Sequence, residues 1–164
     1  MKPQSFLLIL LAVAFTGGLT TFAAQKIAPS AGRDVSLFDF DWKFHKGEVP
    51  GAERPSFDVR EWQPINLPHD WSIEGPFDEN NPGRTAFGYL PGGVGWYRKD
   101  FTIDSKDSKR KLFLQFDGVY ENSKVWLNGT LLGQHGYGFT SFQYDLTPQL
   151  KFGGTNTIVV RAGN

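Results

Sequence analysis

The chain has 164 residues, and its 17 basic and 17 acidic side chains give a formal net charge of zero at pH 7. This balance, without a block of basic residues, argues against binding to nucleic acid or to an anionic membrane surface. The absence of cysteine excludes a small disulfide-stapled fold, whereas 15 phenylalanines, five tyrosines and five tryptophans suit a β-rich core with aromatic surface to spare.

The first 24 residues have the pattern of a secretory signal peptide. Lys2 carries the only charge, residues 6–15 form an apolar run, and small residues follow. We place cleavage after Ala23 or close to it, and the apolar run is too short for a membrane span. We therefore expect an exported protein, periplasmic or extracellular, with no membrane association after cleavage. A flexible leader at 25–35 and one domain at 36–164 complete the expected organisation.

An alternating pattern of aromatic residues predicts the first strand of the domain. A large ring occupies every second position and charged residues stand between the rings, which indicates one buried face. Asp39 and Asp41 are therefore expected on the solvent-facing side. The aromatic residues are Phe38, Phe40, Trp42 and Phe44. A turn region at 46–55 and a short strand at 62–67 follow, and Pro64 favours an edge position for that strand.

The C-terminal half predicts further short strands at 95–103, 112–116, 139–146 and 156–161. The clearest signal is a two-residue hairpin at 124–132, because Asn128-Gly129 supplies both positive-φ residues of a type I′ turn. That turn also explains Asn128-Gly-Thr better than a glycosylation site does. A helical turn is expected from Thr147 to Gly153. Seven or eight short strands without a long helix predict an all-β fold, a jelly-roll β-sandwich.

The stretch from Leu67 to Phe101 contains most of the candidate ligand-binding side chains. A long connection inside a compact β-domain is usually functional. Two interpretations of His69, Asp70 and Trp71 stay open. In one, His69 or Asp70 caps a loop and Trp71 fills the edge of the core. In the other, Asp70 accepts hydrogen bonds from sugar hydroxyls while Trp71 or Tyr89 stacks on a sugar ring.

The adjacent amides Asn80 and Asn81 also allow two interpretations. Their side chains both donate and accept hydrogen bonds, which suits the recognition of hydroxyl groups. The following Pro82-Gly83 makes simple turn chemistry the competing explanation.

The sequence offers no catalytic residue, metal-ligand cluster or cofactor motif. Glycoside hydrolysis needs two carboxylic residues held about 5 to 9.5 Å apart. The loop carboxylates of Glu74, Asp78 and Glu79 lack a second element to position them as such a pair. The three histidines, at positions 45, 69 and 135, are scattered and are read as structural.

Seven motifs in a fixed order resemble the N-terminal sugar-binding domain of glycoside hydrolase family 2, in particular its β-galactosidase-like members. The motifs are LPHDW at 67–71, GYLPGGVGWYRKDF at 88–101, FDGV at 116–119, VWLNG at 125–129, LGQH at 132–135, FQYDLT at 142–147 and NTIVVR at 156–161. The resemblance implies a galactose-binding-like jelly roll, then an immunoglobulin-like domain and a TIM barrel with two catalytic glutamates that act with retention of configuration.

In that family, loops of the jelly roll complete the sugar-binding end of the active site. By resemblance, the region that holds Asp70 and the Asn80-Asn81 stretch is the part expected to reach the sugar. Together with the neighbouring His69 and Trp71, these residues are the candidate substrate-binding residues. The chain departs from the family in having Gly163 where an aspartate is usual and in lacking the barrel. We therefore expect a chain truncated before the barrel, which alone does not hydrolyse a substrate.

Three hypotheses remain at this stage. The first is the N-terminal part of an exported retaining β-galactosidase-like enzyme that helps to bind the non-reducing sugar, with carbohydrate and the downstream domains as partners. The second is a free-standing carbohydrate-binding module, and the third is a structural β-domain without ligand. The sugar is galactose, glucuronic acid or mannose, and the resemblance favours galactose.

Overall fold

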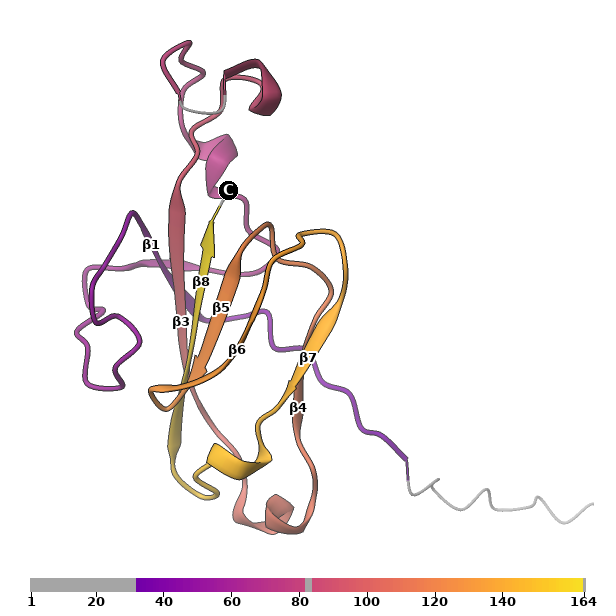
Figure 1. The fold of residues 1–164 in the computed structure, drawn as a ribbon. Helices are drawn as coiled ribbons and strands as arrows, with labels where there is room; N and C mark the ends of the chain where they lie inside the picture. Colours follow the sequence, from indigo (N-terminus) through magenta and orange to yellow (C-terminus); the bar gives the residue numbers. More distant parts are fainter. Residues whose placement is uncertain (1–31, 82–83, 164) are drawn as a thin grey trace, which may run out of the picture. The chain divides into compact units, whose positions relative to one another are not determined.

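The computed structural model describes residues 32–81 and 84–163, and a compact unit begins at Leu37 (Figure 1). The expected signal peptide at 1–24 and most of the leader at 25–35 lie outside the described residues. Within the described part, helical structure is limited to short 3-10 turns: η1 (Trp71–Glu74), η2 (Arg84–Phe87), η3 (Ser105–Lys109) and η4 (Thr147–Gln149). No helix in that part is long and apolar enough to cross a membrane.

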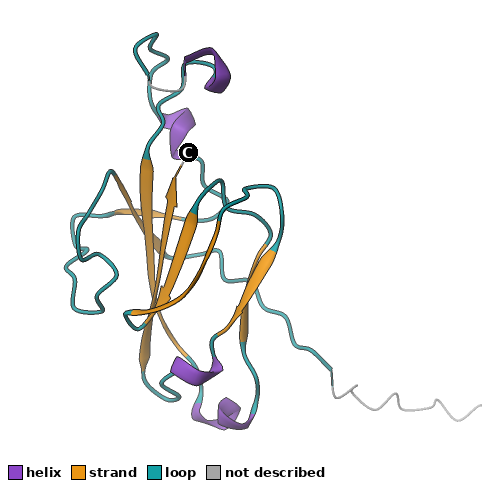
Figure 2. Ribbon diagram, in the orientation of Figure 1, coloured by secondary structure: helices purple, strands orange, loops and turns teal. Residues whose placement is uncertain are grey.

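In residues 32–81 and 84–163, eight strands form two antiparallel sheets that face each other (Figures 1 and 2). The larger sheet has the order β2-β1-β3-β8-β5-β6, and β4 pairs with β7 in the smaller one. The strands are β1 (Trp42–Lys46), β2 (Gln63–Ile65), β3 (Val94–Thr102), β4 (Phe113–Phe116), β5 (Ser123–Leu127), β6 (Thr130–His135), β7 (Phe142–Asp145) and β8 (Thr155–Gly163). The all-β sandwich is confirmed, and β2 with Pro64 lies at the sheet edge as predicted.

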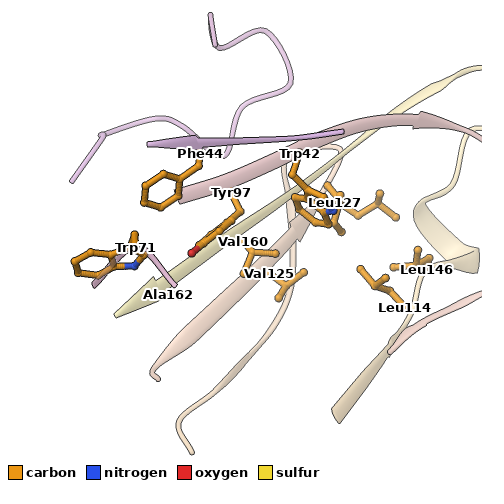
Figure 3. Packing of buried hydrophobic residues seen from close by; sticks show 11 residues of the cluster. Trp42, Phe44, Trp71, Tyr97, Leu114, Val125, Leu127, Leu146, Val160 and Ala162 are labelled. Carbon is orange, nitrogen blue, oxygen red and sulfur yellow. The ribbon is translucent and has the colours of Figure 1, made fainter. Parts of the chain in front are cut away.

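The main core lies between the two sheets (Figure 3). Strand β8 runs between β3 and β5, so Ile158 and Val160 are almost fully buried, as their alternation predicted. A fully buried aliphatic side chain of this size contributes about 1.5 to 3 kcal/mol. The other buried members are Trp42, Phe44, Trp71, Tyr97, Leu114, Val125, Leu127, Leu146 and Ala162.

The predicted hairpin turn is confirmed by its backbone angles, with φ of 52° at Asn128 and 85° at Gly129. The Asn128 side chain also joins the hairpin to the next part of the chain. Its Nδ2 donates to Gln149 O at 2.8 Å and to Asn156 Oδ1 at 2.9 Å, and its Oδ1 accepts the Thr157 N–H at 3.0 Å.

A second apolar cluster covers the outer face of the larger sheet. It packs Trp96 and Val159 of the sheet against Ala52 and Trp62 from the connection between β1 and β2. Trp96 also stacks on Trp126 of β5, with 5.6 Å between ring centroids. The sequence predicts only a turn region for the first part of this connection, because its apolar residues follow neither a helical nor a strand period.

The first predicted strand differs from the observed one. β1 starts only at Trp42, because Asp41 adopts a positive φ of 59° that breaks the alternation. Phe40 is therefore 55% exposed instead of buried, and Asp39 is half-buried instead of lying on a solvent-facing strand. Two smaller differences occur later: the strand predicted at 139–146 is β7, which starts at Phe142, and the helical turn from Thr147 ends at Gln149.

Candidate functional site

A pocket of about 760 Å³ opens between the inner face of the larger sheet and the smaller sheet. Trp42, Tyr97 and Val160 of the larger sheet form one wall, and β4 with the residues after it forms the other. The start of the long connection, at 67–72, closes one side. The pocket brings together three of the predicted site residues: His69, Asp70 and Trp71.

His69 is held by hydrogen bonds from both ring nitrogens. Its Nδ1 lies 3.1 Å from the Tyr97 hydroxyl and its Nε2 lies 3.1 Å from Glu74 Oε1, while its side chain is 9% exposed. A carboxylate only accepts hydrogen bonds, so Nε2 carries the proton, and in the neutral ring Nδ1 accepts the Tyr97 O–H. His69 thereby fixes η1, which ends at Glu74, to strand β3.

The Tyr97 hydroxyl stays protonated in this setting. Burial, followed by the negative charges of Asp70 and Glu74, raises the pKa of Tyr97 well above its usual range. Tyr97 therefore presents a neutral hydroxyl beside the pocket at ordinary pH.

Asp70 caps the 3-10 turn η1. Its Oδ1 accepts hydrogen bonds from the Ser72 N–H at 3.0 Å and from the Ser72 hydroxyl at 2.5 Å. This is the capping role that one interpretation of the sequence proposed, and it satisfies a backbone N–H at the start of the turn. Asp70 is nevertheless an exposed residue that lines the pocket, so its carboxylate also meets solvent there.

Trp71 fills the margin of the main core, as the first interpretation of this residue predicted. Trp71 is 6% exposed and lies at one end of the buried cluster (Figure 3). Lys46 Nζ lies 4.8 Å from its ring centroid. A Cβ on Gly95 would lie 2.9 Å from Trp71 Nε1, so the absence of a side chain at Gly95 makes room for the indole. Tyr89, the alternative stacking residue, is 39% exposed.

Asn80 and Asn81 do not line the pocket, and both amides bond within the long connection. Asn80 Nδ2 and its backbone N–H donate to Asp78 Oδ1 at 2.9 and 2.8 Å. Asn81 Nδ2 donates to Tyr89 O at 2.7 Å. These bonds match the turn interpretation, and contact between these amides and a sugar stays a prediction.

The pocket also includes residues that the sequence did not single out. Their roles depend on tertiary folding, since the lining comes from the segment before β1, from β4 and from the β4–β5 and β6–β7 connections. The aromatic alternation placed Asp39 on a solvated face, Asp117 belongs to the FDGV motif without a role assigned to it, and no local signal marked the others. These residues are Asp39, Gln115, Asp117, Tyr120 and Phe139.

The arrangement offers acceptors around an apolar floor. Carboxylates of Asp39, Asp70 and Asp117 line the pocket, and no lysine or arginine occurs among its described lining residues. No group of three or more metal-binding side chains exists in the described part of the chain. A floor of aromatic rings with polar groups at the margin suits a neutral polyhydroxylated ligand.

A family model described as glycosyl hydrolase 2 galactose-binding domain-like matches residues 66–164. The chain belongs to this family. The matched region of this galactose-binding-like domain contains η1, the long connection and strands β3 to β8, whereas β1 and Asp39 precede it.

Relatives of this domain are glycosidases. A β-galactosidase of Bacteroides ovatus, BoGH2A, is 49% identical over 132 residues, which cover 80% of this chain and 16% of the relative. A putative β-glucuronidase of Formosa agariphila is 40% identical over 134 residues, which cover 82% of this chain and 13% of the relative. A crystal structure of a glycosyl hydrolase family 2 member from Bacteroides cellulosilyticus superposes with a TM-score of 0.75 at 42% identity, over 79% of this chain and 17% of that one.

The domain therefore spans about one sixth or less of the length of each of these relatives. It corresponds to the N-terminal domain of a family 2 glycosidase, as its motifs predicted.

Proposed function

We propose that this domain is the N-terminal part of an exported, retaining family 2 glycosidase that acts on β-galactosides. In this proposal the domain supports the catalytic barrel, and the pocket end of the sandwich helps to hold the non-reducing sugar. The placement of His69, Asp70 and Trp71 together at one pocket carries the proposal. The signal-like segment at 1–24 supports export.

The charge of the pocket favours a neutral sugar over a uronic acid. Its relatives include enzymes named for β-galactosides and for β-glucuronides, so identity alone leaves both open. A glucuronide carries a carboxylate, and three aspartates without a lysine or arginine line the pocket. Like charges about 4 Å apart repel by roughly 1 to 4 kcal/mol near a protein surface. We therefore assign galactosides as the substrate class.

Asp70 is the best residue at which to test contact with the sugar, because its capping of η1 and its proposed bond to a sugar hydroxyl can be separated by substitution. Asp70→Ser keeps a side-chain oxygen that caps η1, whereas Asp70→Ala removes both the cap and the carboxylate. If the carboxylate accepts a sugar hydroxyl, both variants of the longer enzyme should lose about tenfold to a hundredfold in kcat/KM for a nitrophenyl β-galactoside.

The Ala variant alone should also lose about 1 kcal/mol of stability in urea unfolding. Full activity of the Ser variant would show that Asp70 only caps the turn, and a preference for the nitrophenyl β-glucuronide would overturn the substrate class.

A second candidate function, a free-standing carbohydrate-binding module, is supported by the size of the pocket in this domain alone, about 760 Å³. The DNA after the codon for Asn164 separates the two. An open frame encoding a barrel with two glutamates supports the enzyme. A stop codon, together with calorimetric binding of methyl β-galactoside to the 164-residue chain, supports the module.

A further inference from the structure

Three aromatic side chains cluster on the surface near the end of β8. Tyr120 comes from the β4–β5 connection, and Tyr137 and Phe139 come from the β6–β7 connection. They are 42%, 60% and 75% exposed, and the Phe139 ring centroid lies 5.4 Å from that of Tyr120 and 5.7 Å from that of Tyr137. We call these three residues the aromatic cluster. Contiguous exposed apolar surface of this kind marks an interaction site more often than a lone exposed ring does.

The cluster is held in place by close packing of the two connections. A Cβ on Gly138 would lie 2.4 Å from Tyr120 Cδ2, and a Cβ on Gly118 would lie 2.9 Å from the Gly138 carbonyl oxygen. Both positions therefore need glycine for the connections to approach this closely. Rings on a preorganised surface lose little entropy when they bind a partner, and tyrosine is enriched among interface anchors.

The cluster lies beside the place where β8 ends. The backbone N–H and C=O of Glu121, the residue after Tyr120, both bond to Gly163 of β8, with the Gly163 N–H donating to Glu121 O at 2.8 Å. A polypeptide that continues from β8 therefore starts next to the Tyr120 ring. Linkage at such short range raises the effective concentration of a partner surface into the millimolar range.

The opposite end of the sandwich has a different surface. Around η3, Lys106 pairs with Asp104 at 3.1 Å and Arg110 pairs with Asp107 at 3.3 Å. No large apolar side chain is strongly exposed at 103–112 or 147–155, within the described residues. The charged end is therefore suited to contact with solvent. The end with the aromatic cluster is the better candidate for contact with another domain.

We infer that the aromatic cluster is the docking surface for the domain that follows β8 in the longer glycosidase. The inference rests on the proposed function and adds to it the surface that joins the parts. Its partner is an apolar patch on the following domain. The relatives are long enough to contain such a following domain, because this chain spans only 16% of BoGH2A.

The test compares the 164-residue chain with a chimera in which it replaces the matched region of BoGH2A. The double variant Tyr137→Ser/Phe139→Ser removes the two more exposed rings of the aromatic cluster. Leu131→Ser is the control, because Leu131 is 52% exposed but lies on β6, outside the cluster. We expect the double variant to lower the melting temperature of the chimera by about 5 °C and that of the isolated chain by less than about 2 °C, with little effect of the control in either.

Equal effects of the double variant in both proteins would overturn the inference, as would a chimera that stays insoluble with the unchanged cluster. Concentration-dependent self-association of the isolated chain that the double variant abolishes would instead assign the cluster to a second copy. Calorimetric binding of a galactoside to the isolated chain that Tyr137→Ser alone abolishes would assign the cluster to sugar, because Phe139 lines the pocket whereas Tyr137 does not. Galactosidase activity of the chimera reports on the proposed function separately, because an active chimera with equal effects refutes only the docking surface.

Discussion

The guanidinium of Arg98 donates from Nη2 to the backbone carbonyl of Pro55 at 2.6 Å. Its Nη1 donates to the carbonyls of Arg54 at 3.0 Å and Phe57 at 3.3 Å, and the side chain is only 5% exposed. One buried cation on β3 thus satisfies three carbonyls of a connection that has no secondary structure of its own around them. This contact explains how the second apolar cluster stays in place on the outer face of the larger sheet.

Arg98→Met should destabilise the domain by about 3 kcal/mol, because three backbone carbonyls and Asp100 lose the buried guanidinium as a partner while most of the side-chain volume is kept. The free energy of unfolding in urea measures the effect, and proteolysis within 47–62 should accelerate. Arg60→Met is the matched control, since the Arg60 side chain is 85% exposed and its guanidinium pairs with Asp58 at the surface. Its effect should stay within about 0.5 kcal/mol. Equal losses in the two variants would refute the role of Arg98.

Gly95→Ala should disturb the candidate site through Trp71. The added methyl group would lie 2.9 Å from both Trp71 Nε1 and Phe44 Cε2, so one of the two rings must move. Overpacking of this kind costs about 1 to 3 kcal/mol. We expect that loss in urea unfolding together with a changed near-ultraviolet circular dichroism spectrum. Gly154→Ala, whose Cβ would have its nearest neighbour at 3.6 Å, should change neither.

The stability of the domain should fall at high pH because the buried hydroxyl of Tyr97 is then deprotonated more readily in the unfolded chain. Its folded pKa lies above the usual value of 10.0, mainly because of burial. Its contribution is complete below pH 10. It is lost as the pH rises from there toward the folded pKa, because the unfolded chain releases the proton first. The urea midpoint should therefore fall more steeply between about pH 9.5 and 11 in the unchanged chain than in Tyr97→Phe. Parallel curves for the two proteins would contradict the assignment.

Asn128→Asp should destabilise the hairpin although the two side chains have the same shape. The amide Nδ2 donates to Gln149 O and Asn156 Oδ1, so a carboxylate oxygen there faces two acceptors. We expect a loss of about 2 to 4 kcal/mol in urea unfolding at pH 7. Asn122→Asp is the control, because Asn122 also has a positive φ, 50°, but is exposed. A similar small effect at both positions would show that only backbone conformation matters.

Local patterns predicted the elements that follow a simple period. The Asn128-Gly129 hairpin, the edge position of Pro64 and the inward side chains of Ile158 and Val160 could be derived because strand alternation and turn chemistry are local properties. The same rule failed at Phe40. There a single left-handed residue, Asp41, changed which face of the strand its neighbours occupy. Aspartate adopts this conformation more often than most residues, but Asp41 lacks the following glycine that marked the turn at Asn128.

The candidate site was predictable only in part. The motif around His69 and Asp70 lies on one side of the pocket, and the capping contact of Asp70 could be derived because it joins residues two positions apart. The opposite wall, with Gln115 and Asp117, depends on how the two sheets face each other. Arg98 carried no signal either, because a charged residue on a strand is ordinarily solvated and its three carbonyl partners lie more than 40 positions away.

Strand β8 is the last of the described strands in sequence but occupies the middle of the larger sheet, pairing with β3 along its whole length and with β5 on its other edge. During synthesis, a ribosome-bound chain therefore holds β3 and β5 without the strand that joins them. The edges of β3 and β5 that β8 joins stay unpaired until Thr155–Gly163 has been made, and long-range pairing of this kind is slow and prone to aggregation. The nascent domain is thus expected to be prone to aggregation until β8 emerges and pairs with both neighbours.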